Sequence, residues 1–152
     1  MASTFERIVV PIDGSDPSRA ASLLALKVAS TCGGHLIFCH VLDTRELYDK
    51  AATYGYDPRP LLAQMRAEAE DLLDGAIHQA HAGGIEAEYA IVEGRPVDAI
   101  LAAAAARKAN LIVIGTHGRR GLVRLLVGST TEGVLRATGV PVLVVRAEDK
   151  PR

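Results

Sequence analysis

The chain alternates short runs of consecutive apolar residues with longer stretches in which apolar residues recur every three or four positions. Runs of the first kind, rich in Val and Ile, are typical of parallel strands buried on both faces. Stretches of the second kind predict amphipathic helices that pack on a sheet. The predicted strands are Ile8–Ile12, Leu36–Leu42, Ile85–Val92, Leu111–Ile114 and Pro141–Val145. The third alternates apolar and polar residues, so we expect it near an edge of the sheet.

Four helices are predicted between these strands, over about residues 17–32, 61–82, 97–105 and 129–138. For the first helix, Asp16 is the expected N-cap and Pro17 the first helical residue. The last helix is expected to start at Ser129, because Ser129 and Glu132 have the S-x-x-E spacing of a capping box. Glycines follow the ends of three of the helices, which is where helices commonly stop.

Residues 43–57 form a less regular stretch that contains three tyrosines, and no function is assigned to it. Strands that alternate with helices predict an α/β fold with a parallel sheet covered on both faces and right-handed crossovers. No linker, repeat or low-complexity block interrupts this order. We therefore predict one domain over residues 1–152.

Composition excludes several classes of protein. Of the 152 residues, 49% are apolar and 23% charged, with a net charge of -1, so the strongly basic face of a protein that coats nucleic acid is not expected. No apolar run approaches the ~20 residues that cross a bilayer, and no signal peptide is visible. We predict a cytoplasmic protein with neither nucleic-acid nor membrane partners.

Four potential zinc ligands lie close together in the sequence, namely Cys32, His35, Cys39 and His40. Cys39 and His40 are neighbours on one predicted strand, so their side chains point to opposite faces and do not easily share a metal. We interpret them as a core cysteine and a packed histidine. Two cysteines also do not make a disulfide framework.

The residues that follow the strands carry the expected chemistry, because ligands of open parallel sheets bind beyond the carboxyl ends of the strands. Asp13 follows the first strand, and a glycine-rich loop over residues 115–128 follows the fourth. A dinucleotide fold would need G-x-G-x-x-G after the first strand, where only Gly14 is present. A P-loop would need a lysine, and none lies between Gly115 and Glu132. Both common phosphate sites are therefore excluded.

The glycine-rich loop nevertheless has the parts of a phosphate cradle. Gly115 and Gly118 allow a close approach of backbone to ligand. The start of the last helix at Gly128 favours an anion through its free N–H groups and its dipole. Hydroxyl donors and positive charge lie in the same segment, at Ser129, Thr130, Arg119, Arg120 and Arg124. Asp13 offers an acceptor for a ribose hydroxyl or an adenine amino group.

The loop contains Gly115-x-x-Gly118, then nine residues, then Gly128-Ser129. This spacing resembles the G-x-x-G-x9-G-S/T signature of ATP-binding universal stress proteins. The opening run from Ile8 to Ser15 is similar to the first strand of that family. The closing run from Gly139 to Val145 is similar to its last strand. The resemblance covers about residues 4–146.

The resemblance implies a five-stranded parallel sheet of order 3-2-1-4-5 with four helices on both faces, the three-layer sandwich of adenine nucleotide alpha-hydrolase-like proteins. It implies adenine near Asp13 and the backbone of Val41, ribose near Gly115, and phosphates at the loop. The nucleotide-contacting set expected in this way is Pro11, Ile12, Asp13, Val41, Gly115, Thr116, His117, Gly118, Arg119, Gly128, Ser129 and Thr130. It further implies ATP with Mg²⁺ or Mn²⁺ held mainly by the phosphates, and a homodimer through Val142–Val145.

Three functions stay open at this point. The leading hypothesis is a regulatory nucleotide-binding protein of the stress response with little or no turnover. The second is a weak ATPase or nucleotidyl transferase on the same fold, and the third is a dimeric interaction module with a vestigial site. His117 has no visible partner that would orient its ring, so no catalytic residue is assigned.

Overall fold

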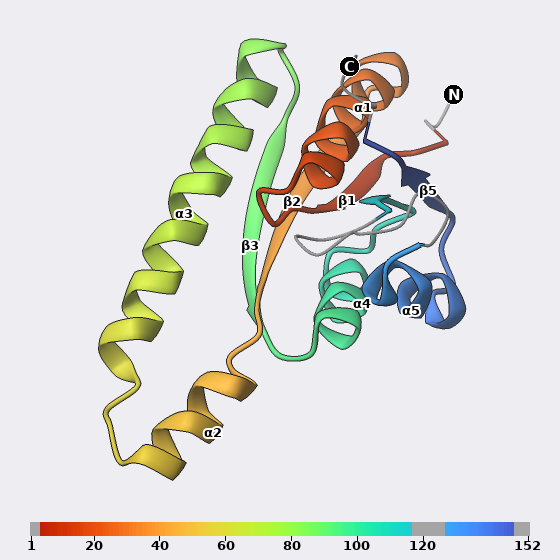
Figure 1. Ribbon diagram of the computed structural model, residues 1–152. Coiled ribbons are helices and arrows are strands. Elements are labelled where there is room, and N and C mark those ends of the chain that lie inside the picture. The colour runs from red at the N-terminus through yellow and green to blue at the C-terminus, as the bar shows by residue number, and fades with distance from the viewer. Residues whose placement is uncertain (1–3, 117–126, 148–152) are drawn as a thin grey trace, which may run out of the picture.

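The computed structural model describes residues 4–116 and 127–147. In this part of the chain five parallel strands form one sheet in the order β3-β2-β1-β4-β5 (Figure 1). The strands are β1 (Arg7–Pro11), β2 (His35–Leu42), β3 (Ala87–Glu93), β4 (Leu111–Gly115) and β5 (Val142–Val145). The predicted α/β class, the strand order and the edge position of the third strand are confirmed.

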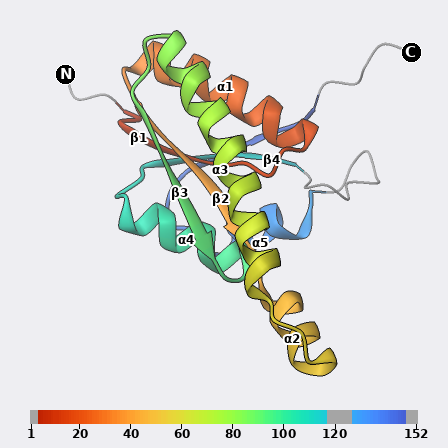
Figure 2. The same ribbon diagram turned by 90° about the vertical axis from the view of Figure 1, so that its left-hand side faces the viewer.

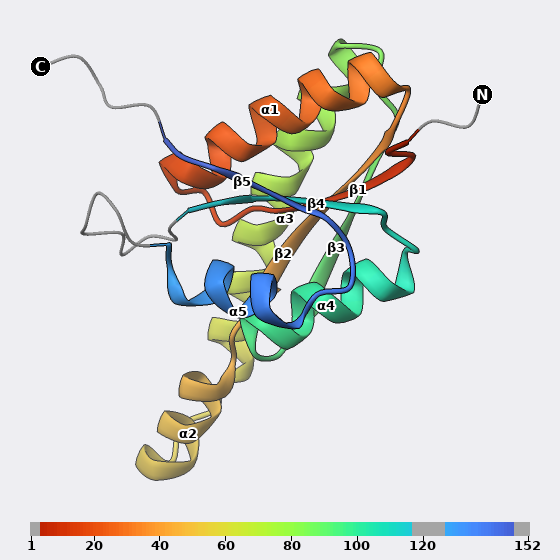
Figure 3. The ribbon, with the colours of Figure 1, turned by 90° about the vertical axis from the view of Figure 1, so that its right-hand side faces the viewer.

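Helices cover both faces of the sheet. Helices α1 (Asp16–Cys32) and α3 (Arg59–Ala82) pack on one face, and α4 (Pro96–Ala106) and α5 (Ser129–Ala137) lie on the other (Figures 2 and 3). The fully buried residues of β1 serve both layers. Ile8 and Val10 pack with α1 and α3, whereas Val9 packs with α4 and α5. A strand with two apolar faces has no polar alternation, which is why it appears as a continuous apolar run.

The structure contains a helix that the sequence analysis missed. Helix α2 (Arg45–Tyr54) occupies most of the stretch interpreted as irregular, so the described residues hold five helices and not the four expected. Only Leu47 and Ala51 are buried on it, spaced by one helical turn. Two apolar positions are too few for a recognisable helical period. Helix α2 and the first turns of α3 project beyond the sheet (Figures 1 and 2).

The start of α1 differs by one residue from the prediction. The N-cap is Ser15 and not Asp16, because the Oγ of Ser15 accepts a hydrogen bond from the backbone N–H of Ser18 at 3.3 Å. Asp16 is the first helical residue, where its charge still suits the helix dipole. The helix ends as predicted at Gly33, which adopts a φ of 69°.

The capping box predicted at the last helix is absent. Gly128 is the N-cap of α5, and no side chain among residues 4–116 and 127–147 caps the helix. Glu132 instead forms an ion pair with Arg136, with 2.7 Å between Oε1 and Nη2. An i,i+4 pair satisfies the carboxylate without the reversal toward the N-cap that the box requires.

Candidate functional site

A cavity of about 180 Å³ lies at the carboxyl ends of β1, β2 and β4. Of the nine predicted nucleotide-contacting residues that the structure describes, six line this cavity, and they come from segments far apart in the sequence. Its lining residues are Pro11, Ile12, Asp13, Ser18, Cys39, Val41, Pro96, Ile100, Ile114, Gly115, Thr130 and Thr131. The position agrees with the general rule, because the chain leaves β1 and β4 toward opposite faces of the sheet and opens a crevice between them.

The other predicted residues have three outcomes. Thr116 lies at the end of β4 next to the cavity. Gly128 and Ser129 form the start of α5, whose next two residues are part of the lining. His117, Gly118 and Arg119 lie outside the described residues.

Among the described residues, six that line the cavity were not predicted from the sequence: Ser18, Cys39, Pro96, Ile100, Ile114 and Thr131. Pro96 and Ile100 come from the first turns of α4, which packs against β1, β2 and β3. Periodicity identified Ile100 as a core position but could not show that the core opens into a cavity there. A signal in the sequence is Pro96 itself, which starts a helix two residues beyond Gly94, the first residue after β3.

The turn after β1 is held rigid by its own polar groups. A carboxylate oxygen of Asp13 accepts a hydrogen bond from the backbone N–H of Ser15 at 2.9 Å. The backbone N–H of Asp13 donates to the Oγ of Ser18 at 3.2 Å. Gly14, between them, has a φ of 82°, which glycine adopts without steric cost. Asp13 is thus oriented at the edge of the cavity before any ligand arrives.

Backbone hydrogen bonds join the two ends of the glycine-rich loop. The N–H of Gly128 donates to the carbonyl oxygen of Thr116 at 2.5 Å, and the N–H of Thr116 donates to Val145 at 2.8 Å. The buried hydroxyl of Thr131 donates to the carbonyl oxygen of Gly115 at 2.7 Å. These bonds hold the start of α5 against β4. Since no side chain of the described residues caps α5, the N–H groups of its first turn are candidates to bind an anion.

Gly115 has a steric role that the sequence did not show. A Cβ at this position would lie 2.6 Å from the carbonyl carbon of Pro17 and 2.7 Å from its carbonyl oxygen. The first turn of α1 therefore crosses the end of β4 at a distance that only glycine permits. The close approach also brings Ser18 to the cavity wall.

Burial raises the pKa of the Cys39 thiol from 9.0 to about 11, although the positive charge of Arg107 opposes this shift. In the unfolded chain this thiol loses its proton near pH 9. The contribution of Cys39 to the free energy of unfolding is therefore complete below pH 9 and is lost as the pH rises toward 11. We expect the unfolding free energy to fall by about 2–3 kcal/mol over that range on account of this group. Urea titrations at pH 8 and pH 11 should show a smaller decrease for Cys39→Ala than for the unsubstituted protein. Equal decreases would contradict the prediction.

The four residues considered as zinc ligands do not converge. Cys39 lies in the hydrophobic core, as interpreted from the sequence. His40 bonds to the carbonyl oxygen of Ile12, and His35 lies 3.8 Å from carboxylates of Glu86 and Glu88. Within residues 4–116 and 127–147, no three potential ligands are placed to hold one metal ion.

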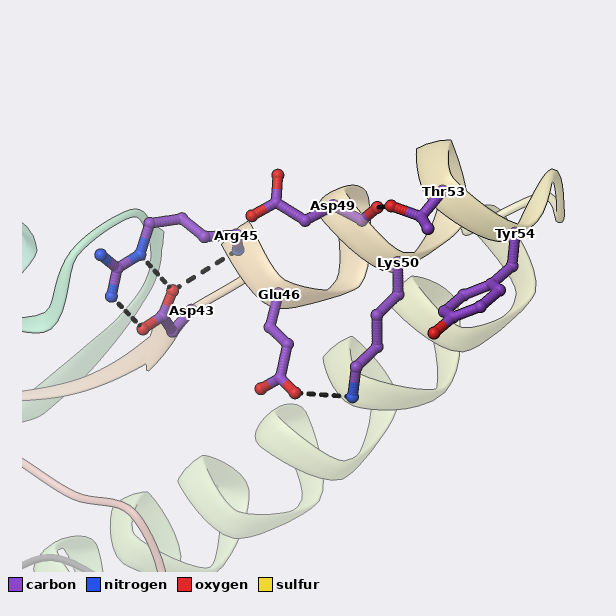
Figure 4. A pocket seen from close by; sticks show the side chains of 7 residues that line it. All are labelled: Asp43, Arg45, Glu46, Asp49, Lys50, Thr53 and Tyr54. Atoms are coloured by element: carbon purple, nitrogen blue, oxygen red, sulfur yellow. Dashed lines mark hydrogen bonds and ion pairs between the residues drawn. The ribbon is translucent and has the colours of Figure 1, made fainter.

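A larger hollow of about 500 Å³ lies on the exposed side of α2 (Figure 4). It is lined by Asp43, Arg45, Glu46, Asp49, Lys50, Thr53 and Tyr54. Most of its charges are paired locally, with 2.6 Å between Arg45 and Asp43 and 2.6 Å between Lys50 and Glu46. The hydrogen bond from Arg45 holds the pKa of Asp43 below its ordinary value. These groups satisfy one another, so the smaller cavity at the strand ends is the better candidate site.

Comparison with known proteins agrees with this architecture. The model of the universal stress protein family matches residues 4–146. Universal stress protein MJ0531 of Methanocaldococcus jannaschii is 31% identical over 147 residues, which cover 96% of this chain and 85% of that protein.

No helix among the described residues has both the length and the apolar character needed to span a bilayer.

Two solved structures share the fold. Universal stress protein UspA from Lactobacillus plantarum superposes with a TM-score of 0.79 at 27% identity, over 93% of this chain and 98% of that one. A universal stress protein in complex with cAMP superposes with a TM-score of 0.65 at 29% identity, over 95% and 98% of the two chains.

Proposed function

The chain belongs to the universal stress protein family, and we propose that it binds ATP as a regulatory protein of the stress response in the cytoplasm, with little or no turnover. One observation carries this proposal. One cavity is lined by Asp13, Val41, Gly115 and Thr130, which come from four separate segments. It lies beside the start of α5, where no side chain of the described part of the chain acts as a cap. A carboxylate, a strand-end backbone and a helix N-terminus provide the three kinds of contact that an adenine nucleotide requires.

The adenine base would lie in the cavity against Val41 and near Asp13, with the ribose at Gly115. The cavity is smaller than the roughly 300–1,000 Å³ of pockets for drug-sized ligands, so it would enclose the base but not the triphosphate. The phosphates would extend to Gly128, Ser129 and Thr130 and to residues of the glycine-rich loop. Mg²⁺ or Mn²⁺ would neutralise the phosphates, which would supply most of its ligands.

Two further observations support an adenine nucleotide. The relative solved with cAMP carries an adenine nucleotide on the same fold. The cavity walls are mainly apolar, with Pro11, Ile100 and Ile114 among them. A flat aromatic base is well accommodated between apolar walls, whereas polar groups at the rim set its orientation.

The proposal of little or no turnover rests on the polar groups of the cavity. Among the described lining residues Asp13 is the only Asp, Glu, Lys, Arg or His, and its carboxylate already bonds to the turn that follows. Phosphoryl transfer needs an oriented nucleophile or water as well as positioned charge. Phosphate release that persists after repurification would favour the alternative, a weak ATPase.

Nucleotide binding is tested directly by thermal unfolding with ATP, ADP, AMP or GTP in the presence of magnesium. At about 100 times the Kd, ATP should stabilise the native protein by about 2.7 kcal/mol and raise its Tm, with a smaller effect of GTP. Chromatography of the supernatant after denaturation would show any nucleotide that copurifies. A Tm unaffected by millimolar ATP, with no heat of binding in calorimetry, would overturn the proposal.

We also propose a homodimer formed through β5. This strand is an edge of the sheet, and its residues are half-buried. The carbonyl oxygen of Pro141 accepts a hydrogen bond from Ile112 of β4, and that of Val145 accepts one from Thr116, the residue after β4. Backbone groups alternate in direction along a strand, so those of Val142 and Val144 face the open edge, where a second copy can pair with them.

Val144→Pro is expected to convert the dimer into a monomer, because proline removes an N–H that faces the open edge and leaves the bonds to β4 in place. Light scattering of the eluted protein should give the mass of one chain. Val144→Thr, which keeps the N–H, should remain dimeric. A Val144→Pro protein that elutes as a dimer would exclude pairing through β5.

A further inference from the structure

His40 lies on β2 between two residues that line the cavity, Cys39 and Val41, but is not itself part of the lining. Successive side chains of a strand point to opposite faces, so the imidazole leaves β2 on the side away from the cavity. A nucleotide in the cavity would not touch it. The ring reaches the end of the neighbouring strand, where its Nδ1 lies 2.8 Å from the carbonyl oxygen of Ile12.

Ile12 is the first residue beyond β1, and two consecutive residues of β2 hold its backbone. Its N–H donates to the carbonyl oxygen of Cys39 at 2.8 Å, and its own carbonyl oxygen faces His40. A carbonyl oxygen only accepts hydrogen bonds, so the imidazole must donate and its hydrogen lies on Nδ1. The bond thus exists whether or not Nε2 is also protonated.

The peptide unit between Ile12 and Asp13 is held at both of its polar atoms. His40 donates to the carbonyl oxygen of Ile12, and the N–H of Asp13 donates to the Oγ of Ser18 at 3.2 Å. Because a peptide unit is planar, two bonds on opposite sides fix the orientation of the whole plane. That orientation sets the direction in which the side chain of Asp13 leaves the backbone. The next residue, Gly14, is conformationally permissive and adds little restraint of its own.

We propose that His40 is a positioning residue of the nucleotide site, which acts through the Ile12–Asp13 peptide from the opposite face of the sheet. This inference rests on the proposed function, since the carboxylate that it orients is the one expected to contact the nucleotide. His40 and Ser18 together preorganise Asp13, so that binding does not have to order the turn.

Two substitutions separate the hydrogen bond from the packing of the ring. His40→Leu removes the hydrogen-bond donor and replaces the ring with an apolar side chain of similar size. His40→Asn retains an N–H donor near the position of Nδ1. We expect His40→Leu to weaken ATP binding about tenfold and His40→Asn to stay within about threefold of the unsubstituted protein, as for the loss and retention of one hydrogen bond. Equal affinities for the His40→Leu and unsubstituted proteins would overturn the inference.

A double-substitution cycle tests whether His40 and Ser18 act on the same peptide. The effects of His40→Leu and Ser18→Ala on the Kd for ATP should be less than multiplicative when combined, because either change already frees the plane. A fully multiplicative result would mean that the two side chains act independently and would contradict the shared role.

Measurements without ligand keep this inference separate from the proposed function. In the unsubstituted protein, long-range ¹⁵N–¹H NMR of His40 should show the hydrogen on Nδ1. In His40→Leu, the backbone amide signals of Asp13, Gly14 and Ser15 should shift, and in His40→Asn they should largely return. A hydrogen found only on Nε2, or unshifted amides, overturns the inference even if ATP binds. If ATP does not bind, the proposed function fails, and these spectra still decide whether His40 orients the turn.

Discussion

Gly115→Ala is expected to lower the free energy of unfolding by about 2–4 kcal/mol, near the upper end of the cost of overpacking a core. The added Cβ would lie between 2.6 and 2.8 Å from three atoms of Pro17, two of which are backbone atoms. A flexible side chain could rotate away, but backbone cannot move without shifting the start of α1. Urea denaturation followed by circular dichroism measures the change.

The same substitution should also impair the candidate site, since a displaced α1 moves Ser18 away from the turn that holds Asp13. Gly75→Ala is the matched control. Gly75 lies within α3, and a Cβ there meets no atom within 4 Å. It should stabilise the protein by about 0.5–1 kcal/mol, because alanine favours the helix. A Gly115→Ala protein as stable as the unsubstituted one would show that α1 does not need this close approach.

Cys39→Leu is expected to weaken ATP binding by roughly 5- to 150-fold. This range corresponds to about 1–3 kcal/mol, the cost of steric overlap in a site that closely fits its ligand. Cys39 is fully buried and lines the cavity, so the larger side chain would occupy space proposed for adenine. The free energy of unfolding should fall by no more than about 1–3 kcal/mol, because part of the added volume overpacks the core residues around Cys39. Calorimetric titration with ATP and thermal unfolding without ligand measure the two effects separately.

Cys32→Leu is the appropriate control for this change. Cys32 is the last residue of α1 and is absent from the cavity lining, so the same substitution there should leave the affinity for ATP unaltered. Undiminished binding by the Cys39→Leu protein would place the nucleotide outside the cavity. Equal loss in both variants would point to a general defect of folding.

The segment from Asp43 to Asp57 illustrates where local pattern fails. Three of the four tyrosines of the chain lie in this segment, and all three are exposed. Helix α2 buries only Leu47 and Ala51, so its sequence lacks the apolar stripe that marks a helix packed on a sheet. The pattern of apolar and polar positions predicts an element more reliably when that element buries more surface. Elements that project from the protein, such as α2, are therefore the hardest to predict from the sequence.

The N-terminus of α5 shows a different limit. The S-x-x-E pattern at Ser129 and Glu132 is compatible with a capping box, but it is equally compatible with the observed pair between Glu132 and Arg136. Both arrangements satisfy the carboxylate, and their free energies differ by only about 1 kcal/mol or less. A pattern of four residues cannot decide between them. The position of Gly128, held by Thr116, decides it in the folded chain.

The sequence alone determined the fold class, the order of the principal elements and the family, because each depends on local periodicity or on a motif with fixed spacing. It also named six residues that prove to line one cavity. Only the tertiary structure decided what completes the cavity wall and what holds it in shape: Pro96 and Ile100 from α4, the approach of Pro17 to Gly115, and the contact of His40 with Ile12. These contacts join residues distant in the chain. Their distances depend on how helices settle on the twisted sheet, which no local pattern encodes.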